Sequence, residues 1–184
     1  MILPIYIYGS SILRSECKDI NSNYKELDVI IDNMFMTMEN ANGIGLSAPQ
    51  IGLPINLFII DLLPYSKEDA SIPPIRKTFI NPKIIKEFGE DIVENEGCLS
   101  IPGVREDVTR KNIVQITYLD QDFKKNDEII DGLYSRVFQH EFDHLKKTLF
   151  IDYLSPIKKN IVNRKLKSIM KGKFTDLYPT ILKK

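Results

Sequence analysis

A helical pattern of apolar residues stands out in the first quarter of the chain. Between Tyr24 and Glu39, apolar side chains recur at intervals of three and four positions, which places them on one face of a helix. These positions are Leu27, Ile30, Ile31, Met34, Phe35 and Met38. The Asn42-Gly43 pair that follows is typical of a turn. The pattern therefore predicts an amphipathic helix over residues 24–39.

The middle of the chain carries shorter apolar runs, which are typical of strands. Residues 113–119 alternate between apolar and polar side chains, whereas residues 56–61 form a continuous run that indicates a buried strand. The other predictions for this region are extended segments at 78–81 and 83–88, a break at Pro82 and a loop at 64–74.

Two further helices are predicted in the last third of the chain. One starts soon after Asp131-Gly132 and runs through Lys146. The other covers about residues 155–172, where apolar residues recur at roughly helical spacing among many lysines and arginines. This last segment is a basic amphipathic helix. Strands are therefore expected in the middle of the chain and helices toward its ends.

Composition is that of an ordinary globular protein. With 184 residues, 43% hydrophobic and 27% charged, the chain has the size of one domain, so residues 1–184 are predicted to form a single domain. Lysine plus arginine and aspartate plus glutamate number 25 each, so no overall field favours DNA or a membrane surface. The first residues do not resemble a signal peptide, and no apolar run reaches the ~20 residues that span a bilayer. We expect a cytoplasmic protein.

The two histidines of the chain, His140 and His144, lie four positions apart in the run His-Glu-Phe-Asp-His. On a helix this spacing points both imidazoles to one side, where they can bind one metal ion with Glu141 beside them as a base. The alternative is a pair of histidines that are merely buried or solvated. Because a catalytic site of this kind takes three protein ligands, a third ligand is needed.

No histidine remains to supply that third ligand, so a carboxylate or one of two cysteines must do so. Cys98 lies in Glu96-Gly97-Cys98-Leu99-Ser100, where glycine permits a tight backbone path and apolar segments flank the cysteine. Cys17 lies in a polar stretch without such a setting. We therefore predict Cys98 as the third ligand, and we expect a reducing compartment because the ligand is a thiolate.

Three segments together resemble the signature motifs of the peptide deformylase family. They occur in the family's order and at similar separations, and the likeness covers roughly residues 1–170. The segments are Gly43-Ile44-Gly45-Leu46-Ser47-Ala48-Pro49-Gln50, Glu96-Gly97-Cys98-Leu99-Ser100 and Gln139-His140-Glu141-Phe142-Asp143-His144-Leu145. The expected fold is α+β, with small antiparallel or mixed β-sheets around a central metal-binding helix and a C-terminal helix.

The resemblance implies a metal-dependent hydrolase that removes the formyl group from the N-terminal formyl-methionine of new polypeptides. The ligands would be Cys98, His140 and His144, with a metal-bound water as nucleophile and Glu141 as general base and acid. The family's oxyanion donors correspond to the side-chain amide of Gln50 and the backbone N–H of Leu99. Fe²⁺ is the expected metal in the cell, and Zn²⁺ is possible in prepared samples.

Substrate contacts are expected on two sides of the metal. The substrate backbone would add as a strand to Ile44, Gly45 and Leu46. Helical spacing back from His140 places Leu133 and Val137 on the metal-facing side, as walls of a methionine pocket.

Two neighbouring residues, Arg136 and Asp143, carry further expectations. Arg136 also falls on the metal-facing side and is expected to bend outward to a surface carboxylate. Asp143 is a candidate for orienting an imidazole, with a simple surface charge as the alternative.

Two positions depart from the family's usual pattern. Ser47 stands where alanine is usual, and its hydroxyl is expected to be tolerated. Lys147 stands where glycine is usual, and it would cost roughly 1 kcal/mol or more if the position needs a positive φ.

Other functions remain open at this stage. A metallopeptidase that cuts internal peptide bonds is the commoner meaning of His-Glu-x-x-His, although such enzymes usually take their third ligand downstream. A module with a purely structural metal is another alternative. The resemblance implies that the basic C-terminal helix contacts the ribosome, with a solvated cationic face as the plain alternative.

Overall fold

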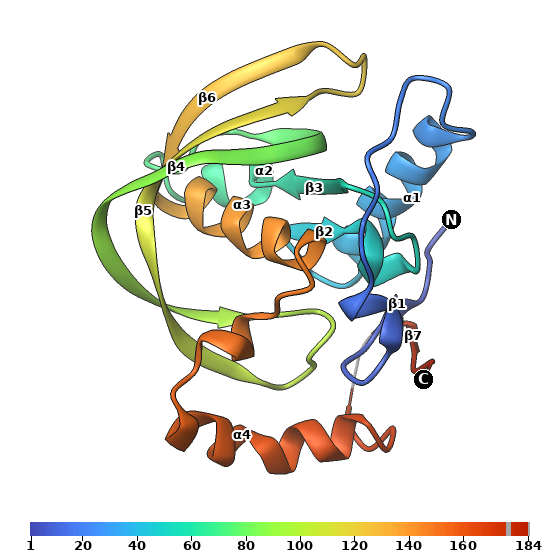
Figure 1. Cartoon of the computed structure of the whole chain (residues 1–184), viewed down its shortest axis with the longest axis vertical. Helices are drawn as coiled ribbons and strands as arrows, with labels where there is room; N and C mark the ends of the chain where they lie inside the picture. The colour runs from blue at the N-terminus through green and yellow to red at the C-terminus, as the bar shows by residue number, and fades with distance from the viewer. Residues whose placement is uncertain (176–177, 184) are drawn as a thin grey trace.

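The computed structural model describes residues 1–175 and 178–183, and Figure 1 shows the arrangement of their helices and strands. The α-helices are α1 (Leu27–Asn40), α2 (Leu63–Ser66), α3 (Gly132–Leu145) and α4 (Pro156–Ile169). Short 3₁₀ turns are η1 (Ser11–Arg14), η2 (Ala48–Ile51) and η3 (Phe150–Tyr153). The strands are β1 (Ile5–Tyr6), β2 (Gly45–Ser47), β3 (Leu57–Asp61), β4 (Arg76–Gly97), β5 (Arg105–Leu119), β6 (Lys125–Asp131) and β7 (Thr180–Ile181).

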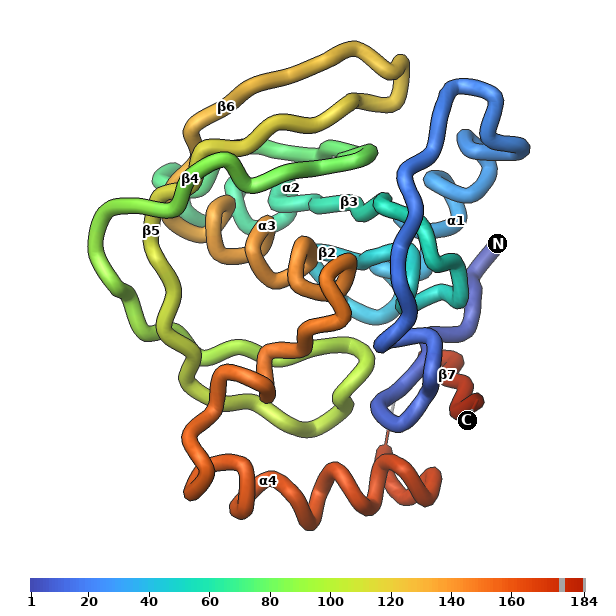
Figure 2. Tube along the Cα trace, viewed as in Figure 1, coloured from blue at the N-terminus to red at the C-terminus, as the bar shows by residue number. Residues whose placement is uncertain are grey.

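Five of the strands form one antiparallel sheet in the order β2-β3-β4-β5-β6, and β1 pairs with β7 in a parallel two-stranded sheet. The long strands β4 and β5 pair as far as Gly97 and Arg105. In Figures 1 and 2 these two strands curve around the middle of the molecule, where α3 lies. The predicted α+β fold with a central helix and a C-terminal helix is confirmed.

The far side of α3 from its histidines packs on the sheet through aromatic rings. Phe138 meets Phe58 and Phe79 edge to face, with ring centroids 5.1 and 5.2 Å apart. All three side chains are fully buried. Edge-to-face pairs at this distance add stabilisation beyond the burial of their area. This packing fixes the height and rotation of α3 over β3 and β4.

Most predicted elements are present. The helices predicted at 24–39, from soon after Asp131-Gly132 through Lys146, and at about 155–172 correspond to α1, α3 and α4. The strand predicted at 56–61 corresponds to β3, and the one predicted at 113–119 lies in β5. The segment 64–74 begins with the short helix α2, and the first motif contains the strand β2, neither of which was predicted.

The predicted break at Pro82 is wrong, because β4 continues through it. The pairing of β4 with β5 shifts register between Ile80 and Lys83. Proline has no N–H for the ladder, so a strand accommodates it at such an irregularity. Asn81 has a φ of +48°, and its side chain bonds both the N–H and the C=O of Ile20.

The C-terminal elements of the described chain pack against its N-terminal segment. The inner face of α4 buries Val162, Leu166 and Ile169 against Ile7 and the segment around Leu149. After α4 the chain returns to place β7 beside β1 (Figure 2). No helix in the described part of the chain is long and apolar enough to cross a membrane.

Lys147 has a φ of +63°, so the strain expected from the missing glycine is present. We predict that Lys147→Gly raises the free energy of unfolding by about 1 kcal/mol, since glycine enters this region freely. For a chain of this size that corresponds to a rise of about 2–4 °C in the melting temperature. Lys146→Gly is the matched control, because Lys146 has a φ of −100°. A melting temperature that does not rise in Lys147→Gly would contradict the prediction.

Candidate metal centre

Three ligand atoms converge beside α3. The Cys98 sulfur and one nitrogen each of His140 and His144 all lie within 4.8 Å of one another. The histidines are one helical turn apart on α3, and Cys98 follows directly after β4. The Cys98 Sγ lies 3.3 Å from the His144 Nε2. The structure therefore brings together the three residues that the sequence predicts as ligands.

The donor set suits a divalent transition metal. One thiolate and two imidazoles are the ligands of zinc and ferrous sites, and three protein ligands leave a position open. Burial is the main cause, and the charge of His140 the second, that holds the pKa of His144 well below its ordinary value. His144 therefore offers the neutral imidazole that binds a metal. Within the described chain its Nδ1 is buried without a hydrogen-bond partner.

The other imidazole is oriented by Glu96. The His140 Nδ1 lies 2.9 Å from the Glu96 Oε2, which leaves the Nε2 of His140 for the metal. Burial raises the pKa of the Glu96 carboxyl, but hydrogen bonds from His140 and Arg110 outweigh burial and hold it well below its usual range. Glu96 is thus a carboxylate, and it accepts from Arg110 at 2.7 and 3.1 Å.

Arg136 belongs to the same buried cluster. Its Nη1 donates to the Glu96 Oε1 at 2.9 Å and to the Val108 carbonyl at 3.1 Å, and its Nη2 donates to the Ile92 carbonyl at 2.7 Å. Arg136 is only 6% exposed, so the expectation that it bends outward is wrong. It also pairs with the half-exposed Glu94 at 3.4 Å, but the buried acceptors on β4 and β5 hold it inside.

Asp143 does not orient an imidazole. Its carboxylate accepts from the Arg110 Nη1 at 2.8 Å and from the Tyr153 hydroxyl at 3.0 Å. Through Arg110 it neighbours Glu96, the residue that performs the predicted role.

Glu141 lies on α3 between the two histidines and is 4% exposed. The Ser47 hydroxyl lies 2.5 Å from the Glu141 Oε2. A Cβ on Gly45 would come within 2.5 Å of the Glu141 Oε1, so only glycine leaves room for this carboxylate. Burial raises the pKa of Glu141, against the opposing effects of His140 and of the Ser47 hydrogen bond.

Gln50 faces the Cys98 turn. Its Oε1 accepts from the Ser47 N–H at 2.8 Å, which fixes the orientation of the amide. The Nε2 then donates to the Ser100 hydroxyl at 3.1 Å and lies 3.6 Å from the Cys98 sulfur. Ser47 therefore contacts both Gln50 and Glu141, through its backbone and its hydroxyl.

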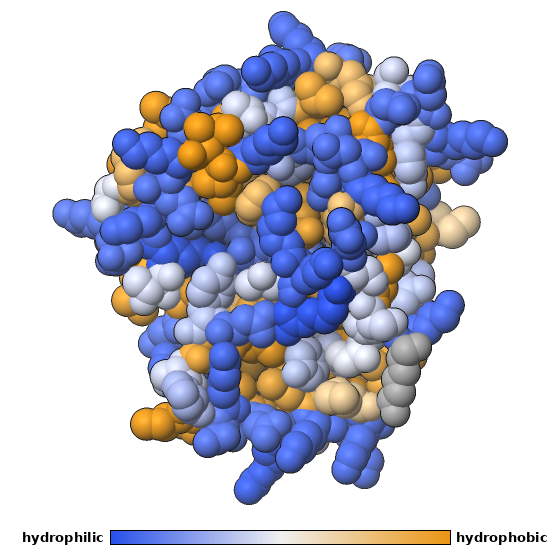
Figure 3. All heavy atoms as spheres, viewed as in Figure 1, coloured by the Kyte–Doolittle hydropathy of each residue, from blue (hydrophilic) through white to orange (hydrophobic). Residues whose placement is uncertain are grey.

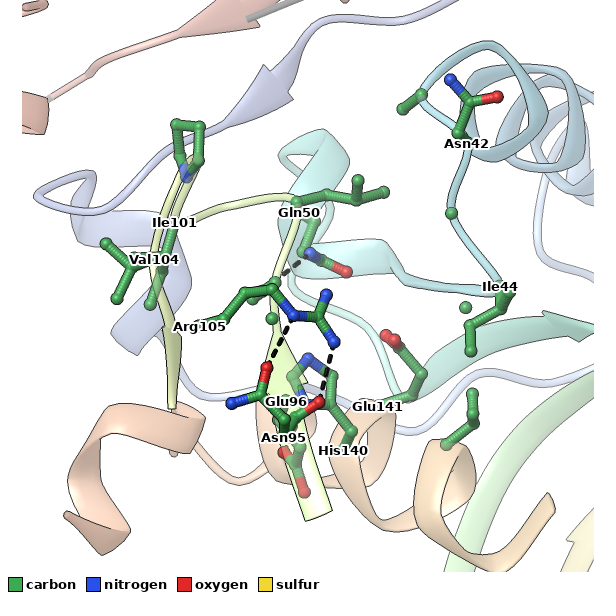
Figure 4. Close-up of a pocket in the computed structure, with 18 of the residues that line it drawn as sticks. Asn42, Ile44, Gln50, Asn95, Glu96, Ile101, Val104, Arg105, His140 and Glu141 are labelled. Atoms are coloured by element: carbon green, nitrogen blue, oxygen red, sulfur yellow. Dashed lines mark hydrogen bonds and ion pairs between the residues drawn. The ribbon is translucent and has the colours of Figure 1, made fainter. Parts of the chain in front are cut away.

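These groups open into a cavity of about 610 Å³. In Figure 4, Asn42 and Ile44 lie on one side and Ile101 and Val104 on the other, with His140 and Glu141 between them. The predicted substrate residues that line the cavity are Ile44, Gly45, Leu133 and Val137, together with Gln50 and Leu99. Leu46 does not line it, because its side chain alternates to the opposite face of β2 and is fully buried.

Several residues of the site were missed from sequence. Glu96 lies two positions before Cys98, and the two-residue period of a strand could have indicated that both face the same way. Arg110 has no comparable signal, because only the β4–β5 register brings it to Glu96. Tyr178 lines the cavity from the end of the chain, which no local pattern indicates.

Comparison with known proteins agrees with the geometry. Residues 2–160 match the polypeptide deformylase family. A peptide deformylase of Flavobacterium psychrophilum is 48% identical over 180 residues, which is 94% of this chain and 93% of that protein. One of Salinibacter ruber is 44% identical and covers 100% of this chain and 96% of its own.

Solved structures show the same fold. A peptide deformylase of Arabidopsis thaliana, in complex with an inhibitor, superposes with a TM-score of 0.83 at 32% identity, covering 92% of this chain and 91% of that one. A peptide deformylase of Legionella pneumophila gives 0.81 at 33% identity, covering 94% and 98%. The resemblance of the three motifs is confirmed, and this chain belongs to the polypeptide deformylase family.

Proposed function

We propose that the chain is a metal-dependent hydrolase that removes the N-formyl group from the N-terminal formyl-methionine of new polypeptides and releases formate. The observation that carries this proposal is the convergence of Cys98, His140 and His144 beside the buried Glu141 in a protein of this family. A bound divalent ion would lower the pKa of a coordinated water and polarise the formyl carbonyl. We propose Fe²⁺ as the metal in the cell, with Zn²⁺ as a form of prepared samples.

In this proposal Glu141 moves the proton. Its Oε2 is engaged by Ser47, which leaves Oε1 directed past Gly45 toward the cavity. Oε1 can take a proton from the attacking water and deliver it to the amine of the leaving methionine. The raised pKa favours this role, because a carboxyl group nearer to neutrality can both accept and return a proton.

The negative charge that develops on the formyl oxygen needs donors from the chain. The Gln50 amide has two hydrogens, of which one is used by Ser100. The same nitrogen lies 3.6 Å from the Cys98 sulfur, so its second hydrogen is directed at the metal centre. The backbone N–H of Leu99, beside Cys98, is the other proposed donor. Donors that are already oriented stabilise such charge without reorganisation.

The substrate backbone is proposed to extend the sheet at β2. Among the strands of the described residues, β2 pairs with β3 alone, which makes it an edge of the sheet. The Ile44 carbonyl accepts from the Asp61 N–H, so the next residue, Gly45, directs its N–H and C=O to the open edge. Leu133 and Val137 supply apolar cavity walls for the methionine side chain.

We further propose contact with the ribosome through the outer face of α4. Hydrophilic side chains follow the lower edge of the molecule in Figure 3, where α4 lies. Arg164 and Lys167 are exposed on this helix, together with the apolar Ile157 and Ile161, which are 75% and 67% exposed. Ribosome contact through α4 would keep the enzyme near nascent chains. A substrate made on the ribosome and a thiolate metal ligand both favour a cytoplasmic location.

Glu141→Gln should lower kcat/KM for a formyl-methionyl tripeptide by about 100-fold or more, because glutamine cannot transfer the proton. The metal content should be unchanged, since Ser47 can still donate to the amide oxygen. The measurement is formate release by anaerobically prepared protein. The control is Glu87→Gln, at an exposed position of β4. Full activity in Glu141→Gln would refute the assignment of Glu141 as the general base. Cleavage of N-blocked peptides at internal bonds, without formate, would favour a metallopeptidase.

Cys98→Ser should weaken metal binding by at least about 100-fold, because the hydroxyl is a poor replacement for a thiolate. The affinity is measured by competition with a chelator. Cys17→Ser is the matched control, since Cys17 is the other cysteine of the chain and burial raises its pKa to about 11. Equal affinity in both variants would remove Cys98 from the ligand set.

Arg164→Glu combined with Lys167→Glu should reduce co-sedimentation with purified bacterial ribosomes, most clearly at low salt. Charge reversal is preferable to truncation, because the inner face of α4 is part of the core. The control is Lys25→Glu combined with Lys67→Glu, which changes the net charge by the same amount at exposed positions outside α4. Equal loss in the two double variants would leave only a general charge effect and would contradict a site on α4.

A further inference from the structure

The segment after Cys98 forms a tight turn. The Ile101 N–H donates to the Cys98 carbonyl at 2.9 Å, so Leu99 and Ser100 are the central residues of a β-turn. The two common turn types differ mainly in the rotation of the central peptide, whose carbonyl belongs to Leu99. That rotation changes ψ of Leu99 and φ of Ser100, so a group that holds the Leu99 carbonyl restrains the backbone of both central residues.

Tyr178 holds that carbonyl from the end of the chain. Its phenol donates to the Leu99 carbonyl at 2.8 Å. Tyr178 also lines the cavity, beside Leu99 and Cys98. Its ring packs with Leu99 against the same apolar cluster. A residue 79 positions away in sequence is thus in contact with the turn that follows the metal ligand.

The position of Tyr178 is fixed by the pairing of β7 with β1. The Ile5 N–H donates to the Pro179 carbonyl at 2.9 Å, directly after Tyr178. The chain also needs glycine at position 9, where φ is +99° and a Cβ would lie 2.9 Å from Met170. The terminal segment is therefore closely packed at this point.

The same two-stranded sheet holds the turn from its other strand. The Tyr8 N–H, just after β1, donates to the Ser100 carbonyl at 2.7 Å. Adjacent carbonyls of the turn, those of Leu99 and Ser100, are thus bound by groups next to β7 and next to β1. Figures 1 and 2 show these two strands side by side.

We infer that Tyr178 is a positioning residue for the reaction: by holding the Leu99 carbonyl, its hydroxyl restrains the backbone of Leu99 in the turn and so keeps the Leu99 N–H, which lies on the preceding peptide, directed toward the formyl oxygen. The inference rests on the proposed function, in which that N–H is an oxyanion donor. The C-terminal segment is then a part of the active site that lies far from the three motifs in sequence.

The test compares Tyr178→Phe with the unaltered chain, both in the zinc-loaded form. Phenylalanine keeps the ring and removes only the hydroxyl. Loss of one hydrogen bond corresponds to a change of about 2- to 12-fold. We expect hydrogen exchange at the Ile101 amide, whose bond to the Cys98 carbonyl closes the turn, to become faster by this factor, as measured by nuclear magnetic resonance. We also expect kcat for formate release to fall by a similar factor, while KM and metal content stay unchanged.

Tyr24→Phe is the matched control, because Tyr24 packs against the same apolar cluster but does not line the cavity. It should change neither quantity. Unchanged exchange at the Ile101 amide, an unchanged kcat, or the same changes in Tyr24→Phe would overturn the inference. If the unaltered chain released no formate, the proposed function would fail, while the exchange measurement would still decide whether Tyr178 holds the turn.

Discussion

The buried carboxylate of Glu96 is the point on which the site and the fold both depend. It accepts from His140, Arg110 and Arg136, which come from α3 and β5, while Glu96 itself lies on β4. A charge taken out of water is tolerated only when it is paired and hydrogen-bonded, so these partners are required together. Removing one partner of such a cluster typically costs about 3–5 kcal/mol, because the other charges stay buried.

This cluster explains how a long, curved pair of strands can carry part of a precise site. β4 and β5 extend well beyond the rest of the sheet, and their far ends have few sheet neighbours. Arg136 and Arg110 tie them to α3 near the ligands, and the aromatic packing of Phe138 ties α3 to the sheet on its other face. The relative position of Cys98 and the histidines is therefore set by two independent contacts of one helix.

A second constraint is the closeness of the first motif to α3. Gly45 leaves room for the Glu141 carboxylate, and Ser47 binds Glu141 and Gln50 at once. The hydroxyl that the resemblance led us to expect as merely tolerated is thus a hydrogen-bond donor to the proposed base. A single short edge strand connects the proton-transferring group, the amide donor and the open edge for the substrate.

Local patterns in the amino-acid sequence predicted most of the helices and strands and the three residues that converge as candidate ligands. The spacing of His140 and His144, the setting of Cys98 and the period of the apolar residues all depend on neighbours within a few positions, which is why local patterns predicted them. Glu96 with Arg110, the inward turn of Arg136 and the contact of Tyr178 with Leu99 were decided only by the tertiary structure. Each of these joins residues far apart in the chain, and their meeting depends on strand register and on how the chain ends pack, which no local period encodes.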